Sequence, residues 1–362
     1  MAKTSFVPSP AKIKVLGLGG GGCNAITRMV QEEIQGVDFI GVNTDAQALL
    51  LTEAPTRIQI GEKLTRGLGV GGDHLLGFKA AEQSREELRE SISGADMVFI
   101  TAGMGGGTGT GTAPVVAELA KQSGALTIAV VTKPFTFEGA HRSKVAEEGI
   151  GQLLDKVDTL ITIPNDRLLL LCDQKTSVDS AFRLADDVLR HAVQAIAEVI
   201  TVPGLINLDF ADVKSVMKDA GPAWMSIGTG SGKSRATDAA NAALASPLLD
   251  VNIEGARGVL FNVTGGSSLT LFEVNEAAQV ISKAVDPDAN IIFGVVFDPK
   301  MDDQVKITLI ATGFVAARGP RIRKDEELRR LLEGTDTEHE LDVPTFLRRR
   351  RPMEVPTSHH RP

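Results

Sequence analysis

The sequence has 362 residues, of which 43% are hydrophobic and 23% charged, enough for two packed domains and a tail. Its formal net charge of −8 argues against nucleic acid as the main partner of the folded chain. No run approaches the roughly 18 apolar residues of a membrane span, and Met1–Lys14 lacks a signal-peptide core. The only cysteines, Cys23 and Cys172, indicate no disulfide framework, so we expect a cytoplasmic protein.

The first predicted strand is Ile13–Leu18, and the glycine run Gly19–Gly22 and a helix at about Asn24–Glu33 follow it. The next strand, Phe39–Val42, ends close to Asp45. Gly17, Gly19 and Gly22 fit the GxGxxG fingerprint, and the acid lies where a dinucleotide-binding enzyme would hold a ribose. This match alone is weak, but it keeps open an oxidoreductase that uses a nicotinamide or flavin.

The stretch Gly103–Gly111 contains six glycines and two threonines, Thr108 and Thr110. A strand-like run, Met97–Thr101, precedes it, and Pro114 is predicted to begin the helix that follows. A glycine-rich turn between a strand and a helix lets backbone N–H groups converge on an anion. A flexible linker would lack these two neighbours, so we interpret the stretch as a phosphate-binding loop.

The rest of the first half alternates strands with helices, which predicts a doubly wound α/β domain around a parallel sheet. Ligand loops then lie at the carboxyl ends of the strands, so all three glycine-rich segments and Asn165 meet at one edge. The expected segments are the strand Arg57–Ile60, the glycine-rich Arg66–Gly72, the helix Lys79–Ile92, the strand Leu126–Val131, the helix Ser143–Val157 and the strand Thr159–Ile163.

A long apolar helix is predicted at Val178–Val202, and its apolar residues cover most of its circumference, so we expect it to be buried between layers. A second, smaller α/β domain should follow at 221–314, with strands at Met225–Thr229, Val259–Val263, Ile291–Phe297 and Ile307–Thr312 and helices at Thr237–Ala245 and Leu271–Val285. Within it, Gly230–Ser234 is similar to the end of a Walker A motif. That motif requires glycine where this chain has Ile227, so we interpret the segment as a polar turn.

Five stretches, in this order, resemble the tubulin/FtsZ family: Gly19–Gly22, Gly105–Gly111, Pro134–Gly139, Ile163–Asp166 and Asn207–Asp212. The resemblance covers about residues 11–314. It implies a self-assembling GTPase that polymerises head to tail in the bacterial division ring, in the cytoplasm at midcell. Cys23 departs from the asparagine that the family often has, and His141 from its lysine or arginine.

The resemblance also assigns a GTP/GDP site, with Mg²⁺ held mainly by the phosphates and no metal site made by the protein. The residues that it assigns to the phosphates are Gly20, Gly21, Gly22, Cys23, Asn24, Gly103, Gly106, Gly107, Thr108, Gly109 and Thr110. It assigns Thr132, Glu138 and Arg142 to contacts with ribose and phosphate, and Asn165, Phe182 and Asp186 to guanine. A carboxylate accepts from the N1–H and N2 amino group of guanine, which adenine lacks. Phe182 lies four residues before Asp186, on the same helix face. The structural alternatives are a core phenylalanine and a solvated carboxylate.

Asn207, Asp209 and Asp212 are the predicted catalytic residues, in a loop after the long helix. The 16 residues from Asp186 to Val202 span roughly 24 Å of helix, so these carboxylates cannot reach the γ-phosphate on their own chain. We therefore expect them to act on the nucleotide of a neighbouring copy. The alternative is structural, with Asp212 capping a helix that begins at Val213.

The tail contains an apolar segment, Leu341–Leu347, followed by Arg348–Arg351, and it resembles the recognition peptide at the family's C-terminus. We expect Asp342, Val343, Pro344, Phe346, Leu347 and Arg348 to bind membrane-tether and regulatory division proteins. A solvated basic end is the alternative. This segment argues against a paralogue that segregates plasmids or controls cell shape.

The predicted organisation along the chain has seven parts. These are a disordered lead (1–11), the GTP-binding domain (12–177), the central helix (178–202), the catalytic loop with its following helix (203–220), the C-terminal domain (221–314), a linker (315–340) and the partner-binding tail (341–362).

Overall fold

The computed structural model describes residues 11–172, 175–201, 209–248, 253 and 255–314. Residues 1–10 of the lead, Asn207, the linker and the tail therefore lie outside the described residues, and the predicted domain boundaries stay predictions. The strands are β1 (Ile13–Leu18), β2 (Val37–Asn43), β3 (Thr56–Gln59), β4 (Met97–Gly103), β5 (Leu126–Lys133), β6 (Thr159–Pro164), β7 (Gly221–Ser231), β8 (Gly258–Gly265), β9 (Asn290–Phe297) and β10 (Gln304–Thr312).

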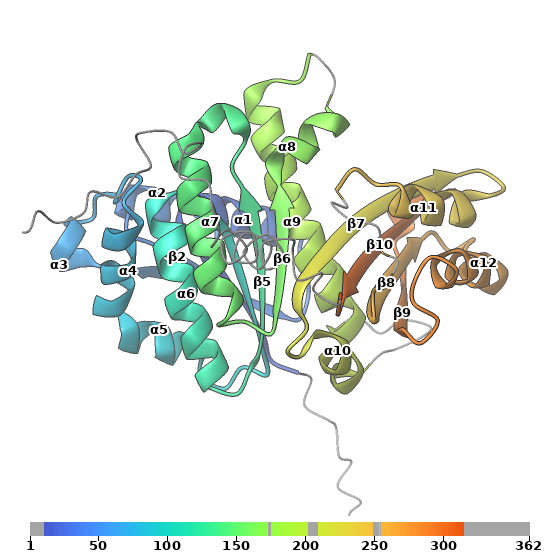
Figure 1. Cartoon of the computed structure of the whole chain (residues 1–362), viewed down its shortest axis with the longest axis horizontal. Helices are drawn as coiled ribbons and strands as arrows, with labels where there is room; N and C mark the ends of the chain where they lie inside the picture. Colours follow the sequence, from blue (N-terminus) through green and yellow to red (C-terminus); the bar gives the residue numbers. More distant parts are fainter. Residues whose placement is uncertain (1–10, 173–174, 202–208, 249–252, 254, 315–362) are drawn as a thin grey trace, which may run out of the picture. The chain divides into compact units, whose positions relative to one another are not determined.

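The α-helices follow the strands in the alternation that the sequence predicted (Figure 1). They are α1 (Gly19–Gln31), α2 (Ala46–Leu50), α3 (Glu62–Thr65), α4 (His74–Gln83), α5 (Arg85–Ile92), α6 (Gly107–Gln122), α7 (Ala140–Leu154), α8 (Asn165–Leu168), α9 (Val178–Thr201), α10 (Phe210–Met217), α11 (Arg235–Leu244) and α12 (Leu271–Ser282). Short 3₁₀ turns lie at η1 (Thr136–Glu138), η2 (Leu169–Leu171) and η3 (Pro299–Met301).

The described strands follow the order β3-β2-β1-β4-β5-β6-β7-β10-β8-β9. Every pair from β3 to β7 is parallel, whereas β10 is antiparallel to both β7 and β8. β1 lies between β2 and β4, so the strand order reverses beside it, and such a switch point is where doubly wound sheets bind ligands.

Helices cover both faces of the parallel sheet, because successive strand residues point to opposite faces. Val15 of β1 joins a cluster with α1, α9 and α10, whereas its neighbour Leu16 joins one with α4, α5, α6 and α7. Figure 1 shows α6 and α7 in front of the strands and α1 behind them. A third apolar cluster unites β8, β9 and β10 with α11 and α12. The predicted doubly wound domain with a smaller α/β domain is therefore confirmed.

Helix α9 is buried as expected over most of its length, because it packs against α1 and β5 on one side and against β9 and β10 on the other. From Leu184 to Thr201 no residue of α9 is exposed. Its first turns differ, since Val178 and Phe182 are exposed. The beginning of the helix is therefore accessible to a ligand.

Several helix boundaries differ from the predictions, and α1, for example, begins at Gly19 rather than at about Asn24. The single helix predicted at Lys79–Ile92 is two helices, α4 and α5, which meet at Ser84. Helix α6 begins at Gly107 rather than at Pro114, which lies inside it. Glycine is a poor helix former in isolation, but Gly107–Ala117 is buried along its whole length, and this packing outweighs the propensity.

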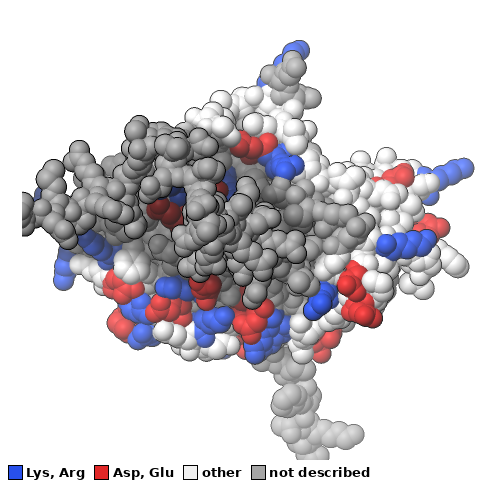
Figure 2. All heavy atoms as spheres, in the orientation of Figure 1, with Lys and Arg blue, Asp and Glu red and all other residues white. Residues whose placement is uncertain are grey.

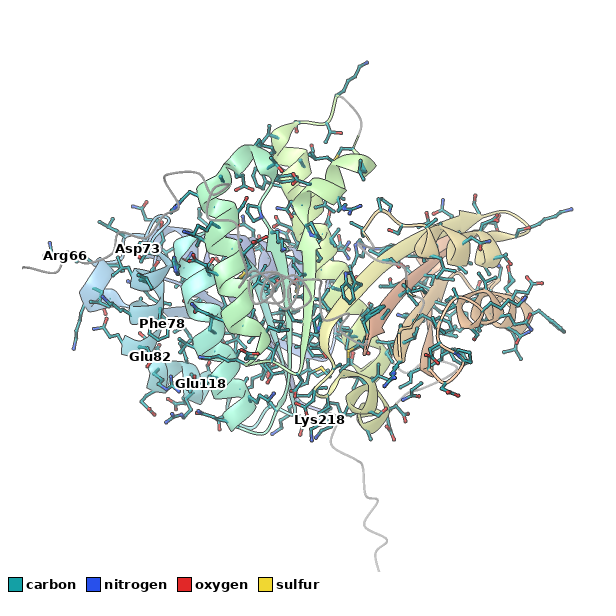
Figure 3. The ribbon with its side chains drawn as sticks, in the orientation of Figure 1. Arg66, Asp73, Phe78, Glu82, Glu118 and Lys218 are labelled. Carbon is teal, nitrogen blue, oxygen red and sulfur yellow. The ribbon has the colours of Figure 1, made fainter. Side chains whose placement is uncertain are left out.

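Ion pairs link α4, α5 and α6 to one another and to Lys156, which follows α7. Arg85 contacts Glu82 and Glu118, each at 2.6 Å, and Lys156 contacts Glu118 at 2.9 Å. Figure 3 shows Glu82 and Glu118 close together, and Figure 2 shows acidic and basic side chains interspersed along this margin. Among the described residues, no helix is long and apolar enough to cross a membrane.

Candidate functional site

A cavity of about 260 Å³, here called the first cavity, opens at the carboxyl ends of the parallel strands. Its lining residues come from the glycine-rich loops, the end of β5, η1, α7, α8 and α9. They are Leu18, Gly19, Gly20, Gly21, Gly71, Gly103, Met104, Gly106, Gly107, Thr108, Gly109, Thr132, Pro134, Glu138, Arg142, Asn165, Phe182, Ala185 and Asp186. The structure thus brings residues of the three glycine-rich segments and Asn165 together at one edge of the sheet, as the sequence predicted.

Two helices, α1 and α6, begin at one end of this cavity. The N–H groups of a first helical turn have no partner within the helix and carry partial positive charge. Gly19 has a φ of +69°, and a Cβ there would lie 2.8 Å from the nitrogen of Gly109. Glycine is therefore required for the two loops to approach each other. Paired helix N-termini in a glycine cradle favour an anion such as a phosphate chain.

Threonine hydroxyls fix the second glycine loop. Thr108 Oγ1 lies 2.7 Å from Thr44 Oγ1, at the end of β2, and both residues are buried. Thr110 Oγ1 accepts a hydrogen bond from the backbone N–H of Gly105 at 2.9 Å, which closes the turn before α6. The backbone of this loop is therefore held in place before any ligand binds.

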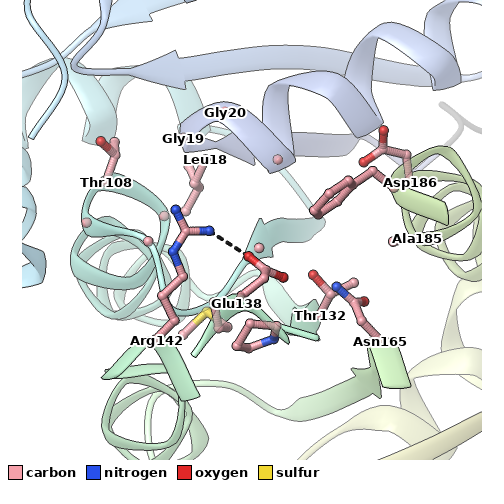
Figure 4. A pocket seen from close by; sticks show the side chains of 18 of the residues that line it. Leu18, Gly19, Gly20, Thr108, Thr132, Glu138, Arg142, Asn165, Ala185 and Asp186 are labelled. Carbon is pink, nitrogen blue, oxygen red and sulfur yellow. Dashed lines mark hydrogen bonds and ion pairs between the residues drawn. The ribbon is translucent and has the colours of Figure 1, made fainter. Parts of the chain in front are cut away.

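The middle of the cavity carries an ion pair. Arg142 Nη1 lies 2.5 Å from Glu138 Oε2, and Glu138 Oε1 accepts from the N–H of Phe135 at 2.9 Å. Figure 4 shows this pair with Thr108 on one side and Thr132 and Asn165 on the other. Asp166 accepts two hydrogen bonds from Thr136, which ties this loop to the end of β6. The Arg142 side chain is 56% exposed, so its guanidinium is accessible to an anionic group.

The other end of the cavity suits a planar, polar ring. Asn165 is only 5% exposed, and its Oδ1 atom is buried without a hydrogen-bond partner. A buried polar group without a partner is costly, so this atom is available to a ligand donor. Phe182 is 40% exposed, and Phe135 contacts it edge to face, with ring centroids 5.4 Å apart. That contact holds the Phe182 ring, which can stack on a ligand.

Asp186 lies one helical turn after Phe182 and forms an ion pair with Arg28 of α1, Oδ2 to Nε, at 3.3 Å. Burial raises the pKa of this carboxyl to about 6, although the arginine acts in the opposite direction. Asp186 also lines a neighbouring cavity, here called the second cavity, together with Asn24, Thr27, Arg28, Gln31, Leu51, Asp179, Phe182 and Arg183. Asp186 and Phe182 therefore both line the two cavities.

Four of the predicted phosphate-site residues do not line the first cavity. Gly22, Cys23 and Thr110 are buried beneath it, and Asn24 lines the second cavity. The Cys23 thiol faces the carbonyl oxygens of Gly17 and Val42, and burial raises its pKa to about 11. It is therefore a neutral thiol that points away from the cavity, whatever its backbone contributes.

Some residues of the site were not predicted from the sequence. The sequence offered a signal for Gly71, because this residue belongs to the third glycine-rich segment, but no sequence motif pointed to Arg28. Asp45, which would hold a ribose in a dinucleotide enzyme, instead caps α2 by accepting from the N–H groups of Gln47 and Ala48. The acid that supported the oxidoreductase alternative is thus accounted for by a helix cap.

The predicted catalytic acids lie elsewhere. Asp209, rather than Asp212, caps α10, and each carboxylate accepts from the other residue's backbone N–H, at 2.8 Å and 3.4 Å. Helix α10 contacts the amino end of β6, where Thr159 bonds to the Met217 carbonyl, and the first residue of β9, where Asn290 bonds to Ser215. Asn165 follows the carboxyl end of β6, a strand of six residues that spans about 20 Å. Figure 1 shows α10 and α8 at opposite ends of the sheet.

Two family profiles match the sequence. Residues 12–173 match the GTPase domain of the tubulin/FtsZ family, and residues 221–315 match the C-terminal domain of the FtsZ family. Both halves of the described fold are therefore covered.

Among solved structures, a dimer of M. jannaschii FtsZ described as empty is 49% identical, with a TM-score of 0.83, over 85% of this chain and 90% of that one. Two Haloferax volcanii proteins share the fold at 20% identity. They are CetZ1, a GDP-bound monomer (TM-score 0.73, 89% of this chain and 99% of that chain), and CetZ2, a GTPγS-bound protofilament (TM-score 0.71, 90% and 100%).

Proposed function

The chain belongs to the tubulin/FtsZ family of GTPases, and from this premise we propose that it hydrolyses GTP to GDP and phosphate at the contact between copies stacked head to tail. Its filaments would form part of the bacterial division ring, in the cytoplasm at midcell. Self-association has support from the FtsZ dimer and the CetZ2 protofilament among the similar structures.

One observation carries this proposal: the candidate nucleotide cavity and the acidic cap of α10 lie at opposite edges of the sheet. Within one chain, the 15 residues of α9 after Asp186 already span about 23 Å. No rotation of a side chain covers that distance. Repeated head-to-tail stacking, in contrast, places the acidic edge of one copy against the cavity of the next.

We assign three groups of residues in the first cavity to the three parts of the nucleotide. The amides of the α1 and α6 termini bind the phosphates, Thr132, Glu138 and Arg142 bind ribose and phosphate, and Asn165, Phe182 and Asp186 bind guanine. Both lining carboxylates already pair with arginines, so Mg²⁺ would be held mainly by the phosphates and water. That ion, when bound, neutralises charge on the phosphates.

In the assembled filament, Asp209 and Asp212 of one copy would polarise the water that attacks the γ-phosphate on its neighbour, and Asn207 would aid its placement. The reciprocal cap leaves carboxylate oxygens free, since each has several lone pairs and accepts one of these bonds. Loss of either aspartate should lower turnover by about 10²–10⁴-fold, while GTP binding survives.

Mixing two inactive variants tests this proposal. Asp212→Ala removes a catalytic acid, and Gly106→Leu blocks the cavity in a second variant, because a Cβ at Gly106 meets no protein atom within 4 Å and lies on the cavity wall. Gly107→Ser is less suitable, because a Cβ there would lie 2.6 Å from the Gly71 oxygen.

Some contacts in the mixture join an intact cavity to an intact acidic loop, so activity should partly return. Wild-type hydrolysis per molecule should also be near zero when dilute and rise above a threshold concentration. A specific rate that is constant at every dilution, together with no recovery on mixing, would rule out the contact between copies.

A further inference from the structure

We propose that Arg28 determines nucleotide specificity by fixing the Asp186 carboxylate so that it can accept two hydrogen bonds from guanine. This inference rests on the proposed GTP site and adds a residue that lies outside the first cavity. Arg28 would be a positioning residue, because it contacts the carboxylate and not the base.

The contact geometry supports this role. Arg28 lines the second cavity but not the first, whereas Asp186 lines both, so the arginine contacts the carboxylate from the second cavity and leaves the first to the nucleotide. Both side chains are largely buried, at 26% and 16% exposure. An ion pair with this little solvent around it restrains the carboxylate more than an exposed pair would.

The hydrogen-bonding capacity of the carboxylate allows all three contacts. Ionised aspartate has about four lone-pair sites on two oxygens, and Arg28 Nε occupies one of them on Oδ2. Oδ1 and the second site on Oδ2 remain for the N1–H and the N2 amino group of guanine. Protonation would turn one of these acceptors into a donor, so the ionised form is required.

The charges around Asp186 make Arg28 important for that ionised form. The neighbouring Asp187 raises the pKa of Asp186 further. Arg183 on α9 pairs with Asp179 at 2.7 Å rather than with Asp186. Across the first cavity, Glu138 and Arg142 pair with each other. Among the described residues, Arg28 is thus the cation that directly contacts the Asp186 carboxyl, and burial raises the pKa of that carboxyl to about 6.

Helix α1 also links the two ends of the nucleotide. Its first residues line the phosphate end of the first cavity, and Arg28 lies nine residues after Gly19, about 14 Å along the same helix. One rigid element therefore holds both the phosphate loop and the partner of the base-reading carboxylate. The distance between the two is fixed by the helix before a nucleotide binds.

The test compares the affinity for GDP with that for inosine diphosphate, which lacks the N2 amino group but has the same phosphates. Arg28→Gln should lower the preference for GDP over inosine diphosphate by about tenfold, the value of a hydrogen bond to a charged group. Arg28→Lys, which keeps the charge, should recover part of the preference. Arg183→Gln is the matched control, because it removes a cation from the same cavity without touching Asp186, and it should leave the preference unchanged.

The pH profile gives a second measurement. In the wild type, GDP affinity should fall as the pH drops below about 6, because Asp186 becomes protonated. Without Arg28 the carboxyl would protonate more readily, so the fall in Arg28→Gln should begin at higher pH. Both proteins bind the same ligand, so titration of its phosphates cancels in the comparison. A general loss of folding would lower affinity for both nucleotides without changing their ratio.

Asp186→Asn separates the two proposals. If this variant keeps wild-type GDP affinity, the guanine assignment itself is wrong. If it loses affinity while Arg28→Gln behaves like Arg183→Gln in both preference and pH profile, the guanine assignment holds and the role of Arg28 is overturned.

Discussion

The hydroxyl groups of Thr44 and Thr108 lie 2.7 Å apart in the core, joining the end of β2 to the first turn of α6. Thr44→Val keeps the volume but leaves the Thr108 hydroxyl without this partner. We expect GTP affinity to fall by about 0.5–1.5 kcal/mol, the net value of one hydrogen bond, because Thr108 can then turn away from the cavity. Calorimetric titration measures this, and Thr44→Ser, which retains a hydroxyl, should bind as the wild type does.

Gly77 of α4 should be needed for the position of the phosphate loop. A Cβ at this residue would lie 2.3 Å from the carbonyl oxygen of Gly107, whereas a Cβ at Gly151 of α7 would meet nothing within 4 Å. Gly77→Ala should therefore cost about 1–3 kcal/mol of unfolding free energy and weaken nucleotide binding. Gly151→Ala should stabilise the chain by up to about 1 kcal/mol, since alanine is the better helix former. Equal effects of the two substitutions on urea denaturation would contradict this close packing of α4 on α6.

The helix cap made by Asp209 and its proposed catalytic role can be separated by the choice of substitution. Asp209→Ala removes the cap of α10 and should cost about 1 kcal/mol of unfolding free energy. Asp209→Asn keeps a side-chain oxygen that can cap the helix but removes the charge, so stability should stay near the wild-type value while GTP turnover falls. Steady-state phosphate release and thermal denaturation, measured on both variants, give the two readouts. Wild-type turnover in Asp209→Asn would leave this residue with a structural role alone.

The C-terminal domain should lose stability in acid. Arg235 of α11 is buried and contacts Glu273 of α12, Nε to Oε1, at 2.6 Å, which lowers the pKa of Glu273 to about 2. Because the folded pKa lies below the ordinary value of 4.5, the stabilisation is complete above about pH 4.5 and is lost as the pH falls toward 2. Fluorescence of Trp224, the single tryptophan, reports unfolding from β7. Glu273→Gln should be less stable at pH 7 and should lack this part of the acid dependence.

The tail should recruit partners without contributing to catalysis. Deletion of residues 341–362 removes the apolar segment and its arginines but leaves every lining residue of the first cavity. GTP hydrolysis and assembly should stay close to wild type, whereas binding to a membrane-tether protein should be lost. Sedimentation of filaments with and without a tether-coated vesicle measures both properties. Failure of the truncated chain to polymerise would contradict this division of labour.

The sequence by itself determined the doubly wound fold and most of the cavity wall. Strand alternation and glycine-rich loops are local signals, and the carboxyl ends of parallel strands must share one edge, so Gly20, Gly106 and Asn165 could be placed together. Helix boundaries were harder to predict from the sequence. The burial of Gly107–Ala117 under α4 decides where α6 begins, and that packing joins segments far apart in the chain.

Only the tertiary structure decided which side chains contact each other. Arg28 and Asp186 are 158 residues apart, and no spacing rule connects α1 with α9. The Cys23 thiol turns away from the cavity because the packing of α1 on β1 and β2 points it toward their carbonyl oxygens. Asp209, and not Asp212, caps α10 because the chain enters that helix earlier than its apolar pattern indicated. Such pairings depend on how elements pack in three dimensions, whereas a sequence pattern reports only the neighbours along the chain.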